Sequence, residues 1–292
     1  MKMNLQPRLF SACLLLAAVQ SLCPTVEIAD GIYMPMVNLG HPDGNNTINE
    51  TASLELWLSD QVNGSGIDTA LDYQNQEQVG KAMRASGRSR SSMFLLTKIP
   101  NVLSREDTLK YIKTDIAQLG ETPDLVLIHS PCYTGFPSGG CTHASREDMQ
   151  QAWLGMEDAL KAGLTRSIGV SNFLSKDLQP ILDMGGTVPS VNQCEMYVGN
   201  HDDETRDFCN KHKIVYESYM PLGRGNLNVH DARIEKIAKA HGKSVFQVCL
   251  RWVIQTGSPM AVSATKLSHD LSDLDIFDFQ LTDSEMATLD KM

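Results

Sequence analysis

Four side chains whose types suit proton transfer are spaced along the first half of the chain: Asp68, Tyr73, Lys98 and His129. A tyrosine hydroxyl can donate a proton to a carbonyl oxygen while hydride arrives at the carbonyl carbon. A phenol is a poor acid near neutral pH and needs assistance. A neighbouring lysine ammonium favours the phenolate and lowers the tyrosine pKa. We therefore interpret Tyr73 as a proton donor that Lys98 assists.

Asp68 and His129 complete a proton relay with Tyr73 and Lys98, and these four are called the relay residues below. Asp68 is expected to hold Lys98 by an ion pair, and His129 to orient the carbonyl and hydrogen-bond its developing negative charge. Taken singly, each residue has a plainer explanation: a helix-capping acid, a half-buried loop aromatic and two polar residues at strand ends. Because all four fall at consecutive strand ends with complementary chemistry, the relay is the favoured interpretation.

The segments that must position these residues alternate between apolar strands and amphipathic helices. Strands are predicted at residues 37–39, in a short segment that ends at 68, and at 93–97, 124–128, 166–170, 190–193, 214–218 and 260–263. Helices are predicted at 51–62, 76–85, 105–119, 146–162, 175–184, 203–211, 231–241, 244–255 and 282–290. Eight strand–helix units predict a closed (β/α)8 TIM barrel, in which every strand's carboxyl end lies on one face. A hairpin at 25–35 precedes the barrel.

Composition limits the class of protein. The 292 residues are 42% hydrophobic and 21% charged, which is typical of a globular chain, and we predict one domain over residues 24–292. A net charge of −10 argues against nucleic acid as the main partner. No GxGxxG or GxxxxGKS motif is present, so an open dinucleotide-binding sheet is not favoured.

The seven cysteines are scattered without a CxxC motif, so we predict no metal site. Cys132 and Cys141 flank a glycine-rich loop. They can pair in an oxidising compartment, but our interpretation is that both are free thiols.

The first residues have the layout of a secretory signal peptide. Lys2 and Arg8 precede an apolar run over residues 9–19 that is too short to span a bilayer, and small residues follow it. We predict a signal peptide over residues 1–23, with an N-terminal extension as the alternative. The predicted location is the secretory pathway, or the cytoplasm if the signal is not real. Asn45, Asn49 and Asn63 are glycosylation acceptors in the first case.

Several motifs, in order, resemble the aldo-keto reductase family from about residue 25 to the C-terminus. They are Gly66-Ile-Asp-Thr-Ala-Leu-Asp-Tyr73, Thr97-Lys98, Asp124-Leu-Val-Leu-Ile-His129-Ser-Pro131, Ile168-Gly-Val-Ser-Asn-Phe173, Asn192-Gln193, Tyr219-Met-Pro-Leu-Gly223, Leu250-Arg-Trp252 and Phe277-Asp-Phe279. The resemblance implies a catalytic tetrad of Asp68, Tyr73, Lys98 and His129, with Tyr73 as general acid. It also implies an NADPH or NADH cofactor.

The resemblance assigns further residues to the cofactor. Ser171, Asn172 and Gln193 would hydrogen-bond the nicotinamide carboxamide. Tyr219 would stack on the nicotinamide ring, and Leu222 belongs to the same motif. The residues aligned with the family's adenosine-phosphate segment are Ser263, Ala264, His269 and Asp273, with Lys266 nearby as a substitute cation.

This chain departs from the family at the cofactor and at the substrate entrance. Met220 replaces the usual serine after the stacking tyrosine. Asp273 would repel a 2′-phosphate, unless it is a plain surface acid, so NADPH, NADH or both remain open. Gly40 is followed by His41-Pro-Asp instead of the usual Thr-Trp, and the chain ends soon after Phe279, which together suggest an open substrate pocket.

We predict an oxidoreductase that reduces a small aldehyde or ketone. We expect it to act as a single barrel and as a monomer. The alternative is a catalytically impaired barrel that serves as a binding or regulatory module. A third hypothesis is an enzyme that uses bound nicotinamide for isomerisation or diol oxidation. The motifs name no substrate.

Overall fold

The computed structural model describes residues 23–40, 50–134 and 140–292. The predicted signal peptide, except Cys23, and the sequons at Asn45 and Asn49 lie outside the described residues. Asn63 is exposed, in the turn after the first helix.

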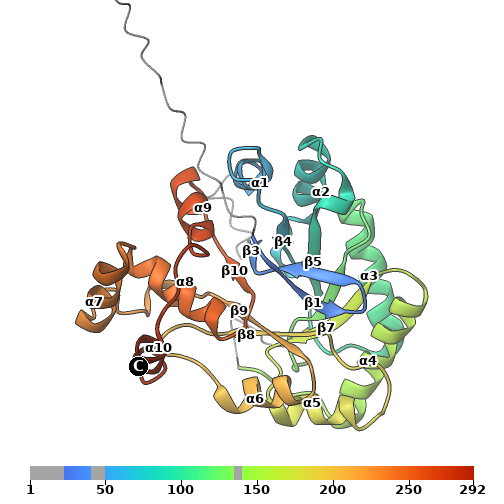
Figure 1. Cartoon of the computed structure of the whole chain (residues 1–292). Helices are drawn as coiled ribbons and strands as arrows, with labels where there is room; N and C mark the ends of the chain where they lie inside the picture. The colour runs from blue at the N-terminus through green and yellow to red at the C-terminus, as the bar shows by residue number, and fades with distance from the viewer. Residues whose placement is uncertain (1–22, 41–49, 135–139) are drawn as a thin grey trace, which may run out of the picture.

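Eight parallel strands form a closed barrel, as the strand–helix alternation predicts (Figure 1). They are β3 (Val37–Gly40), β4 (Gly66–Asp68), β5 (Phe94–Ile99), β6 (Leu125–Ile128), β7 (Ser167–Ser171), β8 (Val191–Glu195), β9 (Val215–Tyr219) and β10 (Met260–Val262). They follow one another around the barrel in chain order, and β10 closes it by pairing with β3. The carboxyl ends of all eight strands therefore lie at one end of the barrel.

Helices surround the barrel. They are α1 (Glu50–Leu58), α2 (Gln76–Ala85), α3 (Arg105–Leu119), α4 (Arg146–Lys161), α5 (Ser175–Leu182), α6 (Asp203–Lys211), α7 (Ala232–His241), α8 (Val245–Gln255), α9 (Leu267–Leu274) and α10 (Asp283–Leu289). Several begin at a residue whose side chain accepts a hydrogen bond from the first turn. Ser104, for example, accepts a hydrogen bond from the backbone N–H of Asp107 at the start of α3.

The sequence analysis missed α9. Its segment is rich in serine and aspartate, which are weak helix formers. Only the spacing of Leu267, Leu271 and Leu274 at positions i, i+4 and i+7 carries a helical signal. In the structure α9 packs beside α1 and α8, and this tertiary contact outweighs the weak local preference (Figure 1).

The predicted hairpin at 25–35 is present: β1 (Thr25–Ala29) and β2 (Ile32–Pro35) pair antiparallel and are joined by a turn at Asp30-Gly31. Its apolar residues Ile28, Ile32 and Met34 pack in one cluster with residues at the start of the barrel strands, among them Phe94, Leu125 and Val191. The hairpin therefore covers the amino ends of the strands. The opposite end of the barrel, where the strands finish, is left for the site.

Strand residues alternate between two apolar clusters. In β5, Phe94 and Leu96 pack with the hairpin, whereas Leu95 and Ile99 belong to the larger cluster between strands and helices. Successive side chains of a strand point to opposite faces, so Lys98 shares the inner face with Phe94 and Leu96. The barrel interior is thus apolar at its base and carries a charged side chain near its top.

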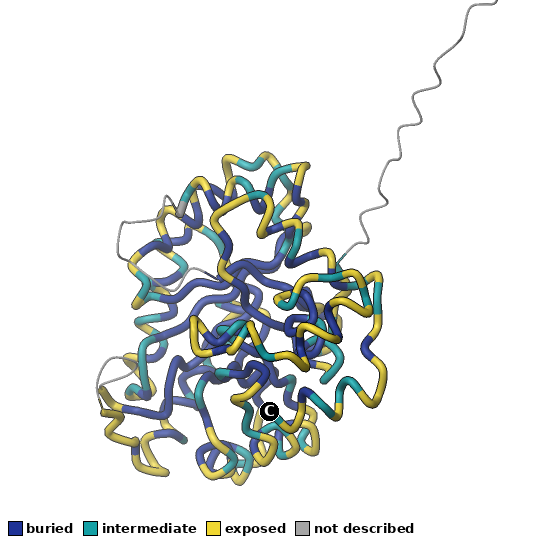
Figure 2. The backbone as a smooth tube through the Cα atoms, turned by 90° about the vertical axis from the view of Figure 1, so that its left-hand side faces the viewer, coloured by how far each residue is buried: buried dark blue, intermediate teal, exposed yellow. Residues whose placement is uncertain are grey.

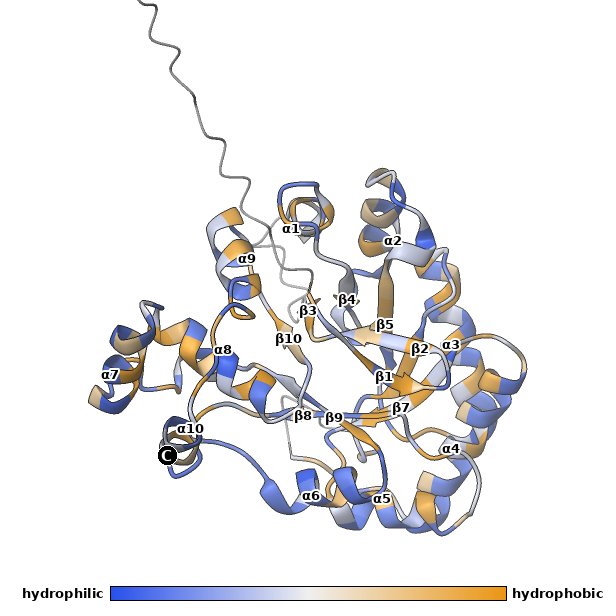
Figure 3. Cartoon of the chain, in the orientation of Figure 1, coloured by the Kyte–Doolittle hydropathy of each residue, from blue (hydrophilic) through white to orange (hydrophobic). Residues whose placement is uncertain are grey.

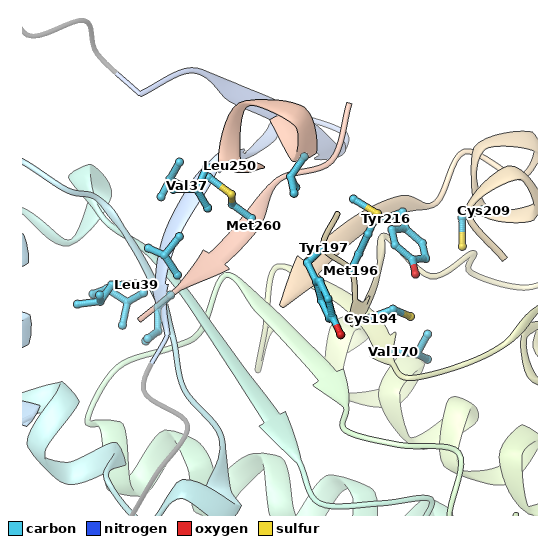
Figure 4. Close-up of a cluster of buried hydrophobic side chains, with 14 of the residues drawn as sticks. Val37, Leu39, Val170, Cys194, Met196, Tyr197, Cys209, Tyr216, Leu250 and Met260 are labelled. Atoms are coloured by element: carbon cyan, nitrogen blue, oxygen red, sulfur yellow. The ribbon is translucent and has the colours of Figure 1, made fainter. Parts of the chain in front are cut away.

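The larger cluster forms the dry layer between barrel and helices. Figure 2 shows buried backbone concentrated at the centre of the molecule, and Figure 3 shows apolar residues along the strands and on part of each helix surface. Figure 4 shows a part of this layer, in which Val37 of β3, Met260 of β10 and Leu250 of α8 lie together. Its burial holds the strands in the register that brings their polar ends together.

The structure corrects one prediction about the cysteines. Cys132 and Cys141 form a disulfide, with their Cα atoms 5.5 Å apart, instead of two free thiols. The chain after β6 turns back on itself, and Cys132 pairs with His143 as an antiparallel bridge. This pairing brings the two cysteines to the distance that a disulfide requires, which their spacing alone did not indicate.

Candidate active site

Asp68 and Lys98 form a buried ion pair inside the barrel. Asp68 ends β4, Lys98 is the penultimate residue of β5, and the two strands are parallel neighbours. The Nζ of Lys98 contacts Oδ1 of Asp68 and also lies 3.3 Å from the carbonyl oxygen of Thr69. Burial opposes the charge on Lys98, but the adjacent Asp68 and Tyr73 outweigh it and raise the lysine pKa. Lys98 is therefore a fixed, permanent positive charge.

Tyr73 lies in a single 3-10 turn, Leu71–Tyr73, between β4 and α2. The turn is held at its flanks, since the Thr69 hydroxyl donates to Oδ1 of Asn75 at 2.6 Å, and Gln74 adopts a left-handed conformation with φ of 55°. The Nζ of Lys98 is 3.4 Å from the Tyr73 hydroxyl and 5.0 Å from the ring centroid. The local structure therefore aims the phenol at the lysine, as the sequence analysis predicts.

The net direction of the Tyr73 pKa differs from the prediction. Burial is the largest influence and raises the pKa, whereas Lys98 lowers it. The carboxylates of Asp68 and Asp72 add to the rise, so the pKa lies above its ordinary value. The prediction considered the lysine and not desolvation. The structure therefore holds Tyr73 in its protonated form at neutral pH, which is the form a proton donor requires.

His129 follows β6 directly and is buried. Its ring lies edge-on to the ring of Tyr73, with centroids 5.6 Å apart, and its Nδ1 is 3.4 Å from a carboxylate oxygen of Asp72. Burial, with a smaller effect of Lys98, lowers the pKa of His129 and outweighs the opposing effect of Asp72. A neutral imidazole carries one N–H donor and one acceptor nitrogen, which suits it to hydrogen-bond a polar ligand beside Tyr73.

Ser171, Asn172 and Tyr219 form a hydrogen-bonded group next to His129. The amide nitrogen of Asn172 donates to the backbone oxygen of His129 at 2.9 Å and to Oγ of Ser171 at 3.0 Å. The Tyr219 hydroxyl donates to Oδ1 of Asn172 at 2.8 Å. Asn172 adopts a left-handed conformation, with φ of 64°, directly after β7. The group therefore fixes the partly exposed ring of Tyr219 at the carboxyl end of β9.

These residues fit a nicotinamide group. A fixed aromatic ring offers a flat face for a second ring, and serine and asparagine side chains offer donors and acceptors that match a carboxamide. Leu222 lies just beyond Tyr219 and is half buried. Met220, between them, has φ of 51°, a conformation that costs energy in a non-glycine residue. Left-handed residues at the ends of β7 and β9 thus shape this side of the site.

Gln193 occupies a different environment from the one predicted. Its amide nitrogen donates to Oδ2 of Asp68 at 2.7 Å and to Oε2 of Glu217 at 2.8 Å. A side-chain amide has two N–H donors and one carbonyl acceptor, so both donors of Gln193 are engaged inside the barrel. Only its carbonyl oxygen remains to accept a hydrogen bond from a carboxamide.

Glu217 is the residue that the sequence analysis missed. It is fully buried in β9, and burial, with the charge of Asp68, raises its pKa to about 8. The available signal was an acid inside the apolar strand 214–218, two residues before Tyr219 and therefore on the same face.

The predicted adenosine-phosphate residues lie around the start of α9. Ser263, Lys266 and His269 are exposed, as a phosphate site would require. Asp273 is buried, which overturns its interpretation as a surface acid, and burial raises its pKa to about 7. The predicted repulsion of a phosphate is therefore weaker than expected, because a carboxyl with this pKa carries only part of its charge near neutral pH.

Other features of the described chain do not add to this site. Within residues 23–40, 50–134 and 140–292, no group of three or more histidine, cysteine or acidic residues is placed to hold a metal ion. Over the same ranges, no helix has the length and apolarity needed to cross a membrane. A hollow of about 750 Å³ lies on the outer surface, lined by Glu77 of α2 and Glu106, Lys110 and Gln118 of α3. It contains none of the relay residues.

Comparisons with known proteins show the family of this chain. The Aldo/keto reductase family model matches residues 46–292. An aldo-keto reductase of Mycobacterium sp. (strain MCS) is 35% identical over 268 residues, which cover 91% of this chain and 89% of the relative. The glyoxal reductase of Bacillus subtilis (strain 168) is 32% identical over 274 residues, which cover 93% and 94%.

Solved structures show the same fold. The aldo/keto reductase from Brucella melitensis has a TM-score of 0.81 and 34% identity, over 92% of this chain and 97% of that chain. An aldo-keto reductase of Bombyx mori in complex with NADP has a TM-score of 0.82 and 28% identity, over 92% of both chains. The family model, the relatives and the barrel itself together show that this chain belongs to the aldo/keto reductase family.

Proposed function

We propose that this chain reduces the carbonyl group of a small aldehyde or ketone to an alcohol, with Tyr73 as the proton donor and NADPH or NADH as the cofactor. The observation that carries the proposal is the 3.4 Å approach of the Tyr73 hydroxyl to Nζ of Lys98, which Asp68 holds by an ion pair. Family membership supports an oxidoreductase that uses a nicotinamide cofactor.

The chain's own residues divide the work of proton transfer. A bound reduced nicotinamide supplies hydride to the carbonyl carbon. Burial keeps Tyr73 protonated until negative charge develops on the substrate oxygen, and the Lys98 charge then stabilises the phenolate that proton donation leaves. Asp68 keeps Lys98 charged and in place. The neutral His129 beside Tyr73 is suited to donate a hydrogen bond to the same oxygen.

The cofactor would lie along the β7–β9 side of the barrel end. Tyr219, held by Asn172, would take the nicotinamide ring, and Lys266 and His269 would face the adenosine phosphate. The exposed Lys266 supports NADPH. In the family's usual pattern an arginine stands at the position of His269, and its absence here supports NADH. Both cofactors are therefore included in the test.

The test is oxidation of NADPH and NADH, followed by absorbance, with a panel of aldehydes and ketones and protein lacking residues 1–23. Turnover with either cofactor supports the proposal. No turnover in folded protein would favour the alternative, a barrel that binds without catalysis. Quenching of tryptophan fluorescence by each cofactor then shows whether binding remains.

We further propose that the protein matures in an oxidising compartment. The Cys132–Cys141 disulfide supports this location, because disulfides are rare in the reducing cytosol. The apolar run at residues 9–19 is consistent with entry into the secretory pathway. Expression of the full chain in a eukaryotic cell, with measurement of the protein in the medium and in the cytosol, tests the proposal. Retention in the cytosol with both thiols reduced would contradict it.

A further inference from the structure

We propose that Glu217 is a positioning residue of the site, which controls the charge around Asp68 and Lys98 through the amide of Gln193. The catalytic part of this inference rests on the proposed function. The link itself rests on contacts inside the barrel.

The contacts form an unbroken chain across the barrel interior. Gln193 of β8 donates from one nitrogen to Oε2 of Glu217 at 2.8 Å and to Oδ2 of Asp68 at 2.7 Å. The other carboxylate oxygen of Asp68 contacts Lys98, whose Nζ lies 3.4 Å from the Tyr73 hydroxyl. A change of charge on Glu217 is therefore four contacts away from the hydroxyl of Tyr73.

The far side of Glu217 is also held. Asn38 of β3 donates from its amide nitrogen to Oε1 of Glu217 at 3.2 Å and to the backbone oxygen of Pro35 at 3.1 Å. Gly66 of β4 makes room for this amide, since a Cβ at Gly66 would lie 1.9 Å from Oδ1 of Asn38. Glu217 is thus clamped between two amides and has no exposed surface.

Two charged groups act on Glu217 across the barrel interior. Asp68 of β4 disfavours its ionisation, and Lys98 of β5 favours it, while the amides of Gln193 and Asn38 are uncharged. Burial is the largest influence, and the result is a pKa of about 8. Glu217 is therefore mostly neutral at pH 7 and becomes charged as the pH rises through about 8.

Ionisation of Glu217 has a defined consequence for the relay. A second negative charge beside Asp68 opposes a further negative charge on Tyr73 and holds the tyrosine proton more tightly. Carbonyl reduction would then slow, because Tyr73 must release that proton. The rate of reduction is expected to fall as the pH rises through about 8, with Glu217 as the titrating group.

The experiment compares wild type, Glu217→Gln and Asp115→Asn. Asp115 is the matched control: it is buried in α3, outside the relay, and its pKa is also raised to about 8 by burial. For each protein, kcat and kcat/KM for carbonyl reduction are measured from pH 6 to pH 10 with saturating cofactor. Circular dichroism establishes that each variant is folded.

Wild type and Asp115→Asn are expected to lose activity above about pH 8, and Glu217→Gln to keep it to a pH at least about one unit higher. A shift of one pH unit corresponds to about a tenfold difference in the fraction of active enzyme at a pH above the pKa. If Glu217→Gln loses activity over the same pH range as wild type, the proposal is overturned. If Glu217→Gln does not fold, a wild-type profile that stays flat from pH 7 to pH 9 overturns it equally.

An infrared measurement separates this inference from the proposed function. Difference spectra of wild type between pH 7 and pH 10 are expected to lose the C=O band of a protonated carboxylic acid, and part of that loss is expected to be absent in Glu217→Gln. Identical difference spectra for the two proteins would overturn the inference without any assay of turnover. Wild type that shows the Glu217 band but reduces no carbonyl would instead overturn the proposed function.

Discussion

Nζ of Lys98 lies 3.4 Å from the hydroxyl of Tyr73, and the two groups come from different segments of the barrel end. Lys98 is fixed by a strand, whereas Tyr73 is carried by a single turn. Phenol and ammonium therefore meet because β4 and β5 are paired neighbours and the turn after β4 is held in place. This relationship leads to the first prediction.

Tyr73→Phe is expected to lower kcat for carbonyl reduction by roughly 10²–10⁴-fold, because the proton donor is removed while the ring remains. Cofactor affinity, measured by fluorescence quenching, should change little. Tyr33→Phe is the control, since Tyr33 is exposed on the hairpin at the opposite end of the barrel. A Tyr73→Phe variant with wild-type kcat would exclude Tyr73 as the general acid.

Lys98→Met is expected to destabilise the fold as well as to abolish turnover. It leaves the buried carboxylate of Asp68 without its cation, which typically costs about 3–5 kcal/mol. Lys81→Met removes an exposed ion pair to Glu77 and should change the free energy of unfolding by less than about 1 kcal/mol. Urea denaturation measures both variants. Equal stabilities would show that the buried pair is not a structural requirement.

Asp270→Leu is expected to raise stability at neutral pH. Asp270 is buried in α9, and neither carboxylate oxygen has a hydrogen-bond partner among the described residues. An unsatisfied buried polar group costs roughly 1–3 kcal/mol. Thermal unfolding at pH 7 measures the gain, with Asp207→Leu on the exposed surface of α6 as the control. A lower Tm for Asp270→Leu than for wild type would contradict this expectation.

Stability should also fall as the pH rises from about 4 to about 8. Burial raises the pKa of Asp270 to about 6, of Asp273 to about 7 and of Asp115 and Glu217 to about 8. In this window the folded state retains protons that the unfolded chain has lost, so raising the pH favours unfolding. Urea midpoints measured across the window test the sign. A stability that increases steadily from pH 5 to pH 8 would contradict the assignment of these groups.

Removal of the Cys132–Cys141 disulfide is expected to lower stability by roughly 2–3 kcal/mol, from the entropy of closing a loop between cysteines nine residues apart. The double variant Cys132→Ser/Cys141→Ser tests this by thermal unfolding. Wild type should lose stability when a reducing agent is added, and the double variant should not respond. A wild-type Tm that is insensitive to reduction would contradict the prediction.

Lys266→Ala separates the two cofactors. Lys266 is exposed at the start of α9. Its replacement by alanine should raise KM for NADPH several-fold and leave KM for NADH unchanged, since only NADPH carries the 2′-phosphate. Lys291→Ala serves as the control, because Lys291 is exposed and follows α10 at the C-terminus. Equal effects on both cofactors would remove Lys266 from the phosphate site.

The sequence by itself determined the barrel and the grouping of the four relay residues. Apolar strands and amphipathic helices alternate over most of the chain, and this alternation admits few architectures. Once a parallel barrel is inferred, strand ends such as Asp68 and His129 must lie on one face, whatever the details of packing. The motifs around these residues, taken in order, also indicated the family from the sequence alone.

Only the tertiary structure decided how these groups interact. The link from Glu217 through Gln193 to Asp68 joins three strands, and no local spacing in the sequence encodes it. The direction of the Tyr73 pKa and the burial of Asp273 depend on desolvation, which is a property of the packed interior. Residue types determine which groups can carry a charge, and packing determines the desolvation free energy of each charge and therefore the direction of its pKa shift.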